Sequence, residues 1–301
     1  MEYKQLGNTK ERIPEIGIGT WKMLSGASDI EAIRMAIEHG STLVDTAEMY
    51  GNEEIVGEAI KGAKYVFIAT KVSPHNFHYD DVIKACDASL KKLGVKQIDL
   101  YQLHWPNHSI PISETMRAME QLKEEGKIRY IGVSNFEVRE FEEAQAALKN
   151  SEIVSNQVEY SILVRDIEKD ILGFCKKNRV TIIAYSPFAR GVLFNRKYEP
   201  LFAKLSAIGE NHDKTASQAA LNWLIEKEGV VAIPKASDKH HAIENADASG
   251  WHMTPMEISE LNHFLSKIRK RTMASVFTPV IKHSGFWSRR MTPGPKKANL
   301  K

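Results

Sequence analysis

Four ionisable side chains follow apolar segments of the chain at comparable positions. Lys71 ends the run from residue 65 to 70, His104 ends another run, and Asp45 ends a third, with Tyr50 a few residues later. If the runs are buried parallel strands, their carboxyl ends meet on one face of a barrel, where such barrels carry out chemistry. A tyrosine beside a lysine and an aspartate is expected to be an acid with a lowered pKa, and a nearby histidine is suited to orient a carbonyl group.

Eight short, nearly continuous apolar segments alternate with stretches of helical periodicity. The pattern predicts strands covered on both faces. Eight alternating units favour a closed (β/α)8 TIM barrel of class α/β over an open doubly wound sheet. The predicted strands are Ile16–Thr20, Thr42–Asp45, Val66–Thr70, Ile98–Leu103, Tyr130–Val133, Ile153–Gln157, Thr181–Tyr185 and Val230–Ile233.

Segments at both ends of the chain add to this barrel. Gly7-Asn8-Thr9 between Tyr3–Leu6 and Arg12–Ile13 predicts an N-terminal β-hairpin that plugs the barrel floor. Apolar periodicity predicts a C-terminal helix over Pro255–Lys270. We expect residues 1–270 to form the barrel domain. Residues 271–301 carry seven Lys or Arg and no acidic residue, which favours a basic capping loop or tail whose aromatic side chains are Phe277, Phe286 and Trp287.

Length and composition limit the classes of protein to which the chain can belong. Its 301 residues suit one barrel, which typically needs about 250. The net charge of +3 gives no reason to expect nucleic acid as a partner. No apolar run approaches the roughly 18 residues that a membrane span requires. A polar N-terminus and two isolated cysteines, Cys86 and Cys175, favour a reducing, cytoplasmic location with free thiols.

Several long segments resemble the signature segments of the aldo-keto reductases. They are LVDTAEMYGNEEIVGEAI (43–60), SLKKLGVKQIDLYQLHWP (89–106), IRYIGVSNF (128–136), NQVEYS (156–161), IIAYSPFARGVL (182–193) and IPKASDKHHAIEN (233–245). The resemblance implies a barrel enzyme that reduces carbonyl groups with a nicotinamide dinucleotide, usually NADPH, and without a metal ion. Pairs of histidines elsewhere in the chain have no supporting ligands nearby, so we expect no metal site.

Position by position, the resemblance places a catalytic tetrad on Asp45, Tyr50, Lys71 and His104. Hydride transfer to a carbonyl carbon leaves an alkoxide, so a proton donor must lie within hydrogen-bond reach of its oxygen. Tyr50 is expected to be that donor, with its pKa lowered from about 10 by Lys71. Asp45 is expected to keep Lys71 charged, and neutral His104 to orient the carbonyl. Taken singly, a strand-end lysine also snorkels and a lone histidine is also a core residue.

The resemblance also implies the residues that bind the cofactor. Ser134, Asn135 and Gln157 match residues that hydrogen-bond the nicotinamide carboxamide, and Tyr185 matches the residue that stacks on the ring. The positions expected to follow the pyrophosphate or to line the nicotinamide and substrate pocket are Ser186, the loop through Leu193, Thr20 and Trp21.

The positions implied to bind the adenosine end of the cofactor match the family pattern only in part. Lys235 matches the lysine that grips the 2′-phosphate, but Ala236 stands where a serine is common and His241 where many members have arginine. Histidine is mostly neutral at pH 7, so the preference for NADPH over NADH is expected to be weaker than with arginine. Lys235 still favours NADPH, and NADH is the second cofactor to consider. Asn245 is expected to contact the adenine, whereas Glu244 either does so or lies on a solvated helix face.

The expected partner is a small-molecule carbonyl substrate, and the expected state is a monomer or a weak homo-oligomer. Two other functions remain open at this point. The same fold is able to serve as a cofactor-binding redox sensor or regulatory subunit with slow turnover. Alternatively, Lys71 in a barrel mouth is able to form a Schiff base, as in an aldolase.

Overall fold

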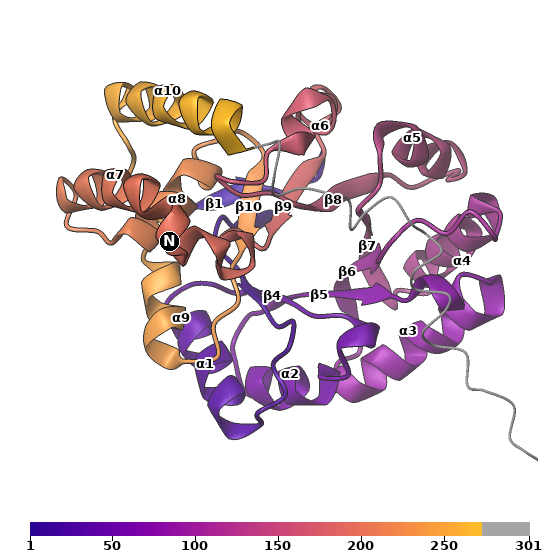
Figure 1. The fold of residues 1–301 in the computed structure, drawn as a ribbon. Helices are drawn as coiled ribbons and strands as arrows, with labels where there is room; N and C mark the ends of the chain where they lie inside the picture. Colours follow the sequence, from indigo (N-terminus) through magenta and orange to yellow (C-terminus); the bar gives the residue numbers. More distant parts are fainter. Residues whose placement is uncertain (273–301) are drawn as a thin grey trace, which may run out of the picture. The chain divides into compact units, whose positions relative to one another are not determined.

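A computed structural model describes residues 1–272, and in it Met1–Ile258 forms one compact unit (Figure 1). Its centre is an eight-stranded parallel sheet in which each strand pairs with the next one along the chain. The expected (β/α)8 barrel is therefore confirmed. The strands are β3 (Ile18–Gly19), β4 (Leu43–Asp45), β5 (Phe67–Val72), β6 (Ile98–Leu103), β7 (Ile128–Ser134), β8 (Ile153–Glu159), β9 (Thr181–Tyr185) and β10 (Val230–Ile233).

Hydrogen bonds between the first and last strands close the sheet. Gly17 N donates to Ala232 O at 2.8 Å, Ala232 N donates to Glu15 O at 2.9 Å, and Gly19 N donates to Pro234 O at 3.1 Å. The two glycines permit this approach, because a Cβ on Gly17 would lie 2.6 Å from the Leu43 carbonyl oxygen and one on Gly19 would lie 2.8 Å from that of Ile233. The Gly17-Ile18-Gly19 segment therefore serves barrel closure.

Helices follow the strands in sequence, as the alternating pattern predicts. The α-helices are α1 (Ala27–Glu38), α2 (Glu53–Ile60), α3 (Tyr79–Leu93), α4 (Ile112–Glu124), α5 (Val138–Ala146), α6 (Ile171–Lys177), α7 (Glu199–Glu210), α8 (Ala216–Ile225), α9 (Lys239–Ala246) and α10 (Pro255–Thr272). Short 3-10 helices lie in the loops: η1 (Glu48–Tyr50), η2 (Pro74–Asn76), η3 (Asp166–Lys169), η4 (Ala189–Phe194) and η5 (Arg196–Tyr198).

An antiparallel hairpin of β1 (Tyr3–Gln5) and β2 (Arg12–Pro14) closes the amino-terminal end of the barrel. Leu6 and Ile13 are fully buried in one apolar cluster with residues from the strands, among them Leu43 and Phe67 at the strand starts. The hairpin turn approaches the barrel so closely that Gly7 N donates to Thr181 Oγ1 at 2.8 Å. The predicted hairpin is therefore confirmed, and it forms the floor opposite the site.

Other expectations are tested only in the described part of the chain. Cys86 and Cys175 are free, buried thiols. Among the described residues, no helix is both long enough and apolar enough to span a membrane. The expected capping loop or tail, residues 271–301, falls from residue 273 onward outside the described residues, and with it Phe277, Phe286 and Trp287.

Candidate active site

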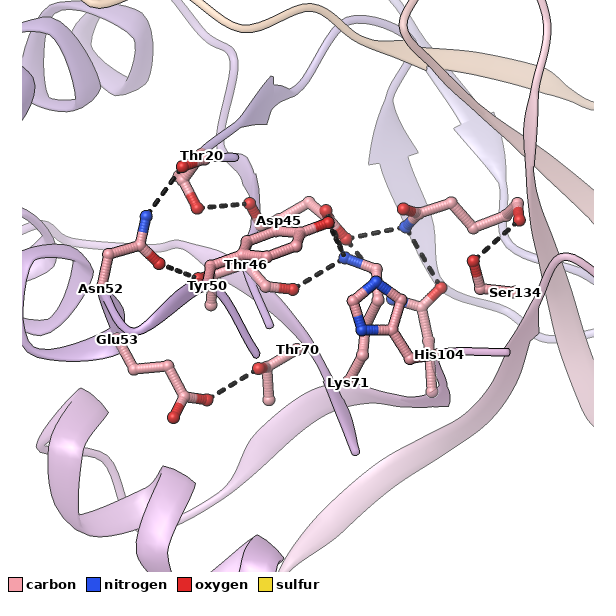
Figure 2. Close-up of polar contacts among 12 residues, drawn as sticks. Thr20, Asp45, Thr46, Tyr50, Asn52, Glu53, Thr70, Lys71, His104 and Ser134 are labelled. Carbon is pink, nitrogen blue, oxygen red and sulfur yellow. Dashed lines mark hydrogen bonds and ion pairs between the residues drawn. The ribbon is translucent and has the colours of Figure 1, made fainter. Parts of the chain in front are cut away.

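Lys71 lies in the barrel interior, one residue before the end of β5, and no part of its side chain is exposed. Its Nζ donates to Asp45 Oδ1 at 2.6 Å and to the Thr46 carbonyl oxygen at 2.7 Å. The same ammonium lies 3.5 Å from the Tyr50 hydroxyl oxygen. Figure 2 shows these side chains converging from β4, η1 and β5. The fold thus brings two other members of the predicted tetrad, Asp45 and Tyr50, within reach of the Lys71 ammonium group.

The Lys71 ammonium remains charged despite its burial. Burial lowers the pKa of Lys71, but the attraction of the Asp45 carboxylate and of Tyr50 outweighs it and raises this pKa above 10.5. An amine held as ammonium has no free lone pair for attack on a carbonyl. The ion pair therefore argues against the Schiff-base alternative.

The pKa of Tyr50 is shifted in the direction opposite to the sequence-based expectation. Burial raises the pKa of Tyr50, Lys71 lowers it, Asp45 raises it, and the net result lies above 10. The expected lowering was wrong because the sequence shows which charges lie near Tyr50 but not how much of the phenol is removed from water. In this state the phenol is protonated at neutral pH, which is the form in which a general acid must start.

His104 directly follows β6, and its ring packs edge-on against that of Tyr50, with centroids 5.5 Å apart and an interplanar angle of 74°. Burial, with help from the Lys71 charge, lowers the pKa of His104 to about 3, so the ring is neutral at physiological pH. Its Nδ1 is buried without a hydrogen-bond partner among the described residues. A neutral imidazole placed beside a protonated phenol is suited to hold a carbonyl oxygen.

The second carboxylate oxygen of Asp45 binds two amides. Gln157 Nε2 donates to Asp45 Oδ2 at 2.7 Å, and Gln102 Nε2 lies 3.4 Å from the same oxygen. Gln157 was expected to bind a carboxamide, whereas Gln102, in the middle of an apolar strand, was not singled out from the sequence. Its polar side chain at a buried strand position was the available signal.

The other residues expected around the nicotinamide form a connected group. Ser134 Oγ donates to Gln157 O at 2.9 Å. Asn135 Nδ2 donates to Ser134 Oγ at 2.9 Å and to His104 O at 3.1 Å, while the Tyr185 hydroxyl donates to Asn135 Oδ1 at 2.8 Å. Asn135 adopts the left-handed conformation, with φ of 64°, which asparagine tolerates better than most residues. The fold thus links β7, β8 and β9 at one edge of the site.

The loop after β9 carries the residues expected along the pyrophosphate. Ser186, Ala189 and Arg190 have positive φ angles of 51°, 50° and 57°. Such left-handed non-glycine residues are costly and gather at functional sites. Leu193, in contrast, is fully buried and serves the core, so the residues of this loop that are open to a ligand lie before it.

The residues expected at the adenosine end lie after β10. Lys235 and His241 are exposed, and Asn245 is buried. Asp238 caps α9 by accepting hydrogen bonds from the first amides of this helix, including that of His241 at 3.3 Å. The Glu244 carboxylate lies 3.4 Å from His241 Nδ1 and accepts a hydrogen bond from a threonine hydroxyl at 2.7 Å. Glu244 is thus engaged with His241 and a threonine of the chain, which neither of its two interpretations, an adenine contact or a solvated helix face, included.

Thr20 and Trp21 directly follow β3, the first strand of the barrel. Thr20 Oγ1 donates to Asp45 O at 3.0 Å, and the Trp21 side chain is 45% exposed. Asn52, which was not expected, ties this loop to the next one by donating to Thr20 O at 2.7 Å and accepting from Thr46 Oγ1 at 2.8 Å (Figure 2). Asn52 has this role only because segments that are separate in the sequence meet in the fold, and no local sequence pattern indicates such a meeting.

Glu48 is a third residue that the sequence did not reveal. It precedes Tyr50 by two positions in η1, and its carboxylate accepts hydrogen bonds from Ser73 N at 2.8 Å and from Asn76 Nδ2 at 2.5 Å. These bonds join η1 to the loop that follows β5. Glu48 therefore fixes the segment that carries the phenol relative to the strand that carries Lys71.

A closed parallel barrel with titratable side chains at the carboxyl ends of its strands is the architecture of a barrel enzyme. The family model described as "Aldo/keto reductase family" matches residues 15–266. The chain is 39% identical over 259 residues to "Methylglyoxal reductase YeaE" of Escherichia coli K12, covering 83% of this chain and 90% of the relative. It is 35% identical over 256 residues to "Glyoxal reductase" of Bacillus subtilis 168, covering 83% and 88%.

Solved structures agree with the sequence relatives. The thermostable aldo-keto reductase Tm1743, in complex with the inhibitor epalrestat, superposes with a TM-score of 0.81 and 42% identity, covering 87% of this chain and 99% of that chain. An aldo/keto reductase from Klebsiella pneumoniae, in complex with NADP and acetate, superposes with a TM-score of 0.79 and 34% identity, covering 88% and 96%. The chain belongs to the aldo/keto reductase family, and it is an oxidoreductase.

Proposed function

We propose that this reductase converts aldehydes or ketones to alcohols by hydride transfer from NADPH, with NADH as a possible second donor. The observation that carries the proposal is the Tyr50 hydroxyl, 3.5 Å from the buried Lys71 ammonium and beside the neutral His104 ring. When bound, the cofactor supplies the hydride. The chain supplies the proton and the orientation of the carbonyl.

The proton is assigned to the Tyr50 hydroxyl. As negative charge develops on the carbonyl oxygen, Tyr50 donates its proton, and the Lys71 ammonium stabilises the phenolate that remains. Asp45 holds this ammonium at 2.6 Å, and His104 offers a neutral donor that fixes the carbonyl oxygen. The raised pKa of the free phenol ensures that the proton is present at the start.

The donors and acceptors of the chain fit a nicotinamide dinucleotide. Both Gln157 Nε2 protons have partners inside the protein, at Asp45 Oδ2 and Gln102 Oε1, so Oε1 of Gln157 is left to accept from a carboxamide. Ser134, Asn135 and Tyr185 lie beside it in one hydrogen-bonded group. The residues proposed to hold the rest of the cofactor are Thr20, Trp21, Ser186 with the loop through Leu193, Lys235, His241 and Asn245.

Small 2-oxoaldehydes are the first substrates to test, because two relatives are named methylglyoxal reductase and glyoxal reductase. We also propose a barrel domain over residues 1–270 with a separate segment 271–301, a cytoplasmic location, and a monomer or weak homo-oligomer as the functional state. The free, buried thiols Cys86 and Cys175 support a reducing compartment.

Replacement of Tyr50 by phenylalanine tests the proposal. Tyr50→Phe keeps the ring against His104 but removes the proton, so kcat for NADPH-dependent reduction of methylglyoxal should fall by about 100-fold or more. Tyr65→Phe is the matched control, since Tyr65 is exposed and contacts Glu11 at the floor of the barrel. The rate is followed by NADPH absorbance. Unchanged turnover in Tyr50→Phe, with a normal unfolding midpoint, would refute the assignment.

A further inference from the structure

Gln102 is a buried amide at the centre of the site that the roles above leave unused. It lies in β6 beside Lys71 of β5 on one side and Gly132 of β7 on the other. None of its surface is exposed. A polar side chain in this position requires partners, because an unpaired amide in the barrel interior is costly.

Gln102 finds its partners in the two residues that join the catalytic and cofactor groups. Its Nε2 lies 3.4 Å from Asp45 Oδ2, and its Oε1 accepts from Gln157 Nε2 at 3.3 Å. Gln157 Nε2 also donates to Asp45 Oδ2 at 2.7 Å. Asp45 Oδ2 and the two amides thus form a closed triangle.

The triangle determines which atom Gln157 offers to a ligand. An amide nitrogen has two protons, and those of Gln157 are taken by Asp45 and by Gln102. Without Gln102, one of them would lose its partner, and rotation of the amide would cost less. With Gln102 in place, Gln157 presents its oxygen, an acceptor, outward from the triangle.

The neighbouring strand is shaped to admit this amide. A Cβ on Gly132 would lie 2.9 Å from Gln102 Cγ and 2.6 Å from Ser155 Oγ. Any larger residue at position 132 would therefore displace Gln102 or the serine. The space beside Gln102 is kept open by the one residue type that has no side chain.

We propose that Gln102 is a positioning residue that fixes the amide of Gln157, so that Gln157 accepts a hydrogen bond from the carboxamide N–H of the nicotinamide cofactor. The inference rests on the proposed function, because it requires a nicotinamide at this place. It goes further by assigning the selection of the carboxamide to a second amide, whose own partners are Asp45 and Gln157.

The test compares two cofactors in variants of Gln102. NADPH carries the carboxamide N–H, whereas its reduced 3-acetylpyridine analogue has a methyl group there and keeps the carbonyl. The wild type should bind NADPH about fivefold more tightly than the analogue, which corresponds to one neutral hydrogen bond. Gln102→Met should reduce this ratio to below about twofold, while Gln97→Met, at an exposed glutamine bonded to Gly126 O, should retain it. Dissociation constants from quenching of tryptophan fluorescence provide the ratio.

Gly132→Ala provides a second, independent perturbation, since it keeps the Gln102 amide but displaces it. It should lower the same ratio, and it decides the matter if Gln102→Met fails to fold. A wild-type ratio in a folded Gln102→Met or Gly132→Ala protein overturns the proposal. A wild type that reduces carbonyls with NADPH yet binds both cofactors equally overturns this inference alone, whereas a wild type that binds neither overturns the proposed function.

Discussion

Lys71 is fully enclosed by the barrel, yet it keeps its charge because an aspartate oxygen lies 2.6 Å away and a phenol lies 3.5 Å away. Tyr50 and His104 show the opposite influence, since burial raises the pKa of the phenol and lowers that of the imidazole. At the scale of single residues, removal from water thus keeps both groups neutral. The one pair of opposite charges among them is the Lys71–Asp45 ion pair.

Lys71→Met should impair both activity and stability. The variant removes the charge beside Tyr50 and leaves the Asp45 carboxylate buried without its cation, which costs about 3–5 kcal/mol of unfolding free energy. The double variant Asp45→Asn, Lys71→Met should recover much of that stability but none of the activity. Urea denaturation and kcat measure the two effects. Equal stability of the single and double variants would contradict the assignment of a buried charge pair.

His104 should make the protein less stable in mild acid. Its pKa falls from 6.5 in the unfolded chain to about 3 in the fold, so the unfolded state binds the extra proton in this range. Its contribution is fully present above pH 6.5 and is lost as the pH falls, with a slope approaching about 1.4 kcal/mol per pH unit near the middle of the range. His104→Gln should show a shallower loss in urea denaturation at pH 6.5 and 5.0. Parallel curves would show that His104 is not buried neutral.

At the scale of elements, periodicity and apolar character predicted where strands and helices lie, and side-chain contacts between loops escaped prediction. The segments Ile98–Leu103, Thr181–Tyr185 and Val230–Ile233 are strands with the predicted bounds. The C-terminal helix α10, in contrast, ends at Thr272 and not at the predicted Lys270. Predictions were accurate where burial on both faces imposes a long apolar run, and less accurate at the ends of helices.

In the candidate site, too, residues within recognisable sequence patterns were predicted, and residues defined by contacts between distant segments were not. Lys71, Tyr50, Asp45 and His104 were found because long segments resemble a known family, and the fold brings them together. Glu48, Asn52 and Gln102 were missed, since their partners come from loops or strands distant in the sequence. The direction of the Tyr50 pKa was also beyond the sequence, because it depends on the depth of burial.

Glu48→Ala should lower kcat for carbonyl reduction by about tenfold to 100-fold. The glutamate ties η1 to the loop after β5, and a displaced phenol loses alignment with the carbonyl oxygen. Glu54→Ala, an exposed acidic residue at the start of α2, is the matched control. Steady-state kinetics at saturating NADPH provide the comparison. Equal rates for both variants would show that η1 holds its position without Glu48.

At the scale of the whole barrel unit, the floor and the site lie at opposite ends of the same strands. The hairpin buries Leu6 and Ile13 against the strand starts, while the strand ends carry Lys71, Asp45 and His104. The floor therefore contributes to stability without taking part in the chemistry, so that variants of the floor are expected to affect folding but leave the reaction intact.

Gly7→Ala should destabilise the fold without changing kcat of the folded protein. Gly7 has a φ of 55°, and a Cβ there would lie 2.8 Å from the Val154 carbonyl oxygen, which belongs to the rigid barrel. We expect a loss of about 2 kcal/mol or more in unfolding free energy. Gly94→Ala isolates the backbone strain, since Gly94 has a φ of 68° with nothing within 4 Å. Equal losses in the two variants would show that the close approach to Val154 adds nothing.

The seam between Glu15–Gly19 and β10 has a consequence for the way the molecule is made. During synthesis the first barrel strand emerges early, and its closing partner at Ala232 emerges only after most of the barrel. Until then the growing chain carries an unpaired sheet edge, which is the part of a protein most prone to pairing with a neighbour. The two-residue length of β3 and its flanking Gly17 keep that edge short and poor in side chains, so the waiting chain offers little to which another nascent chain can attach.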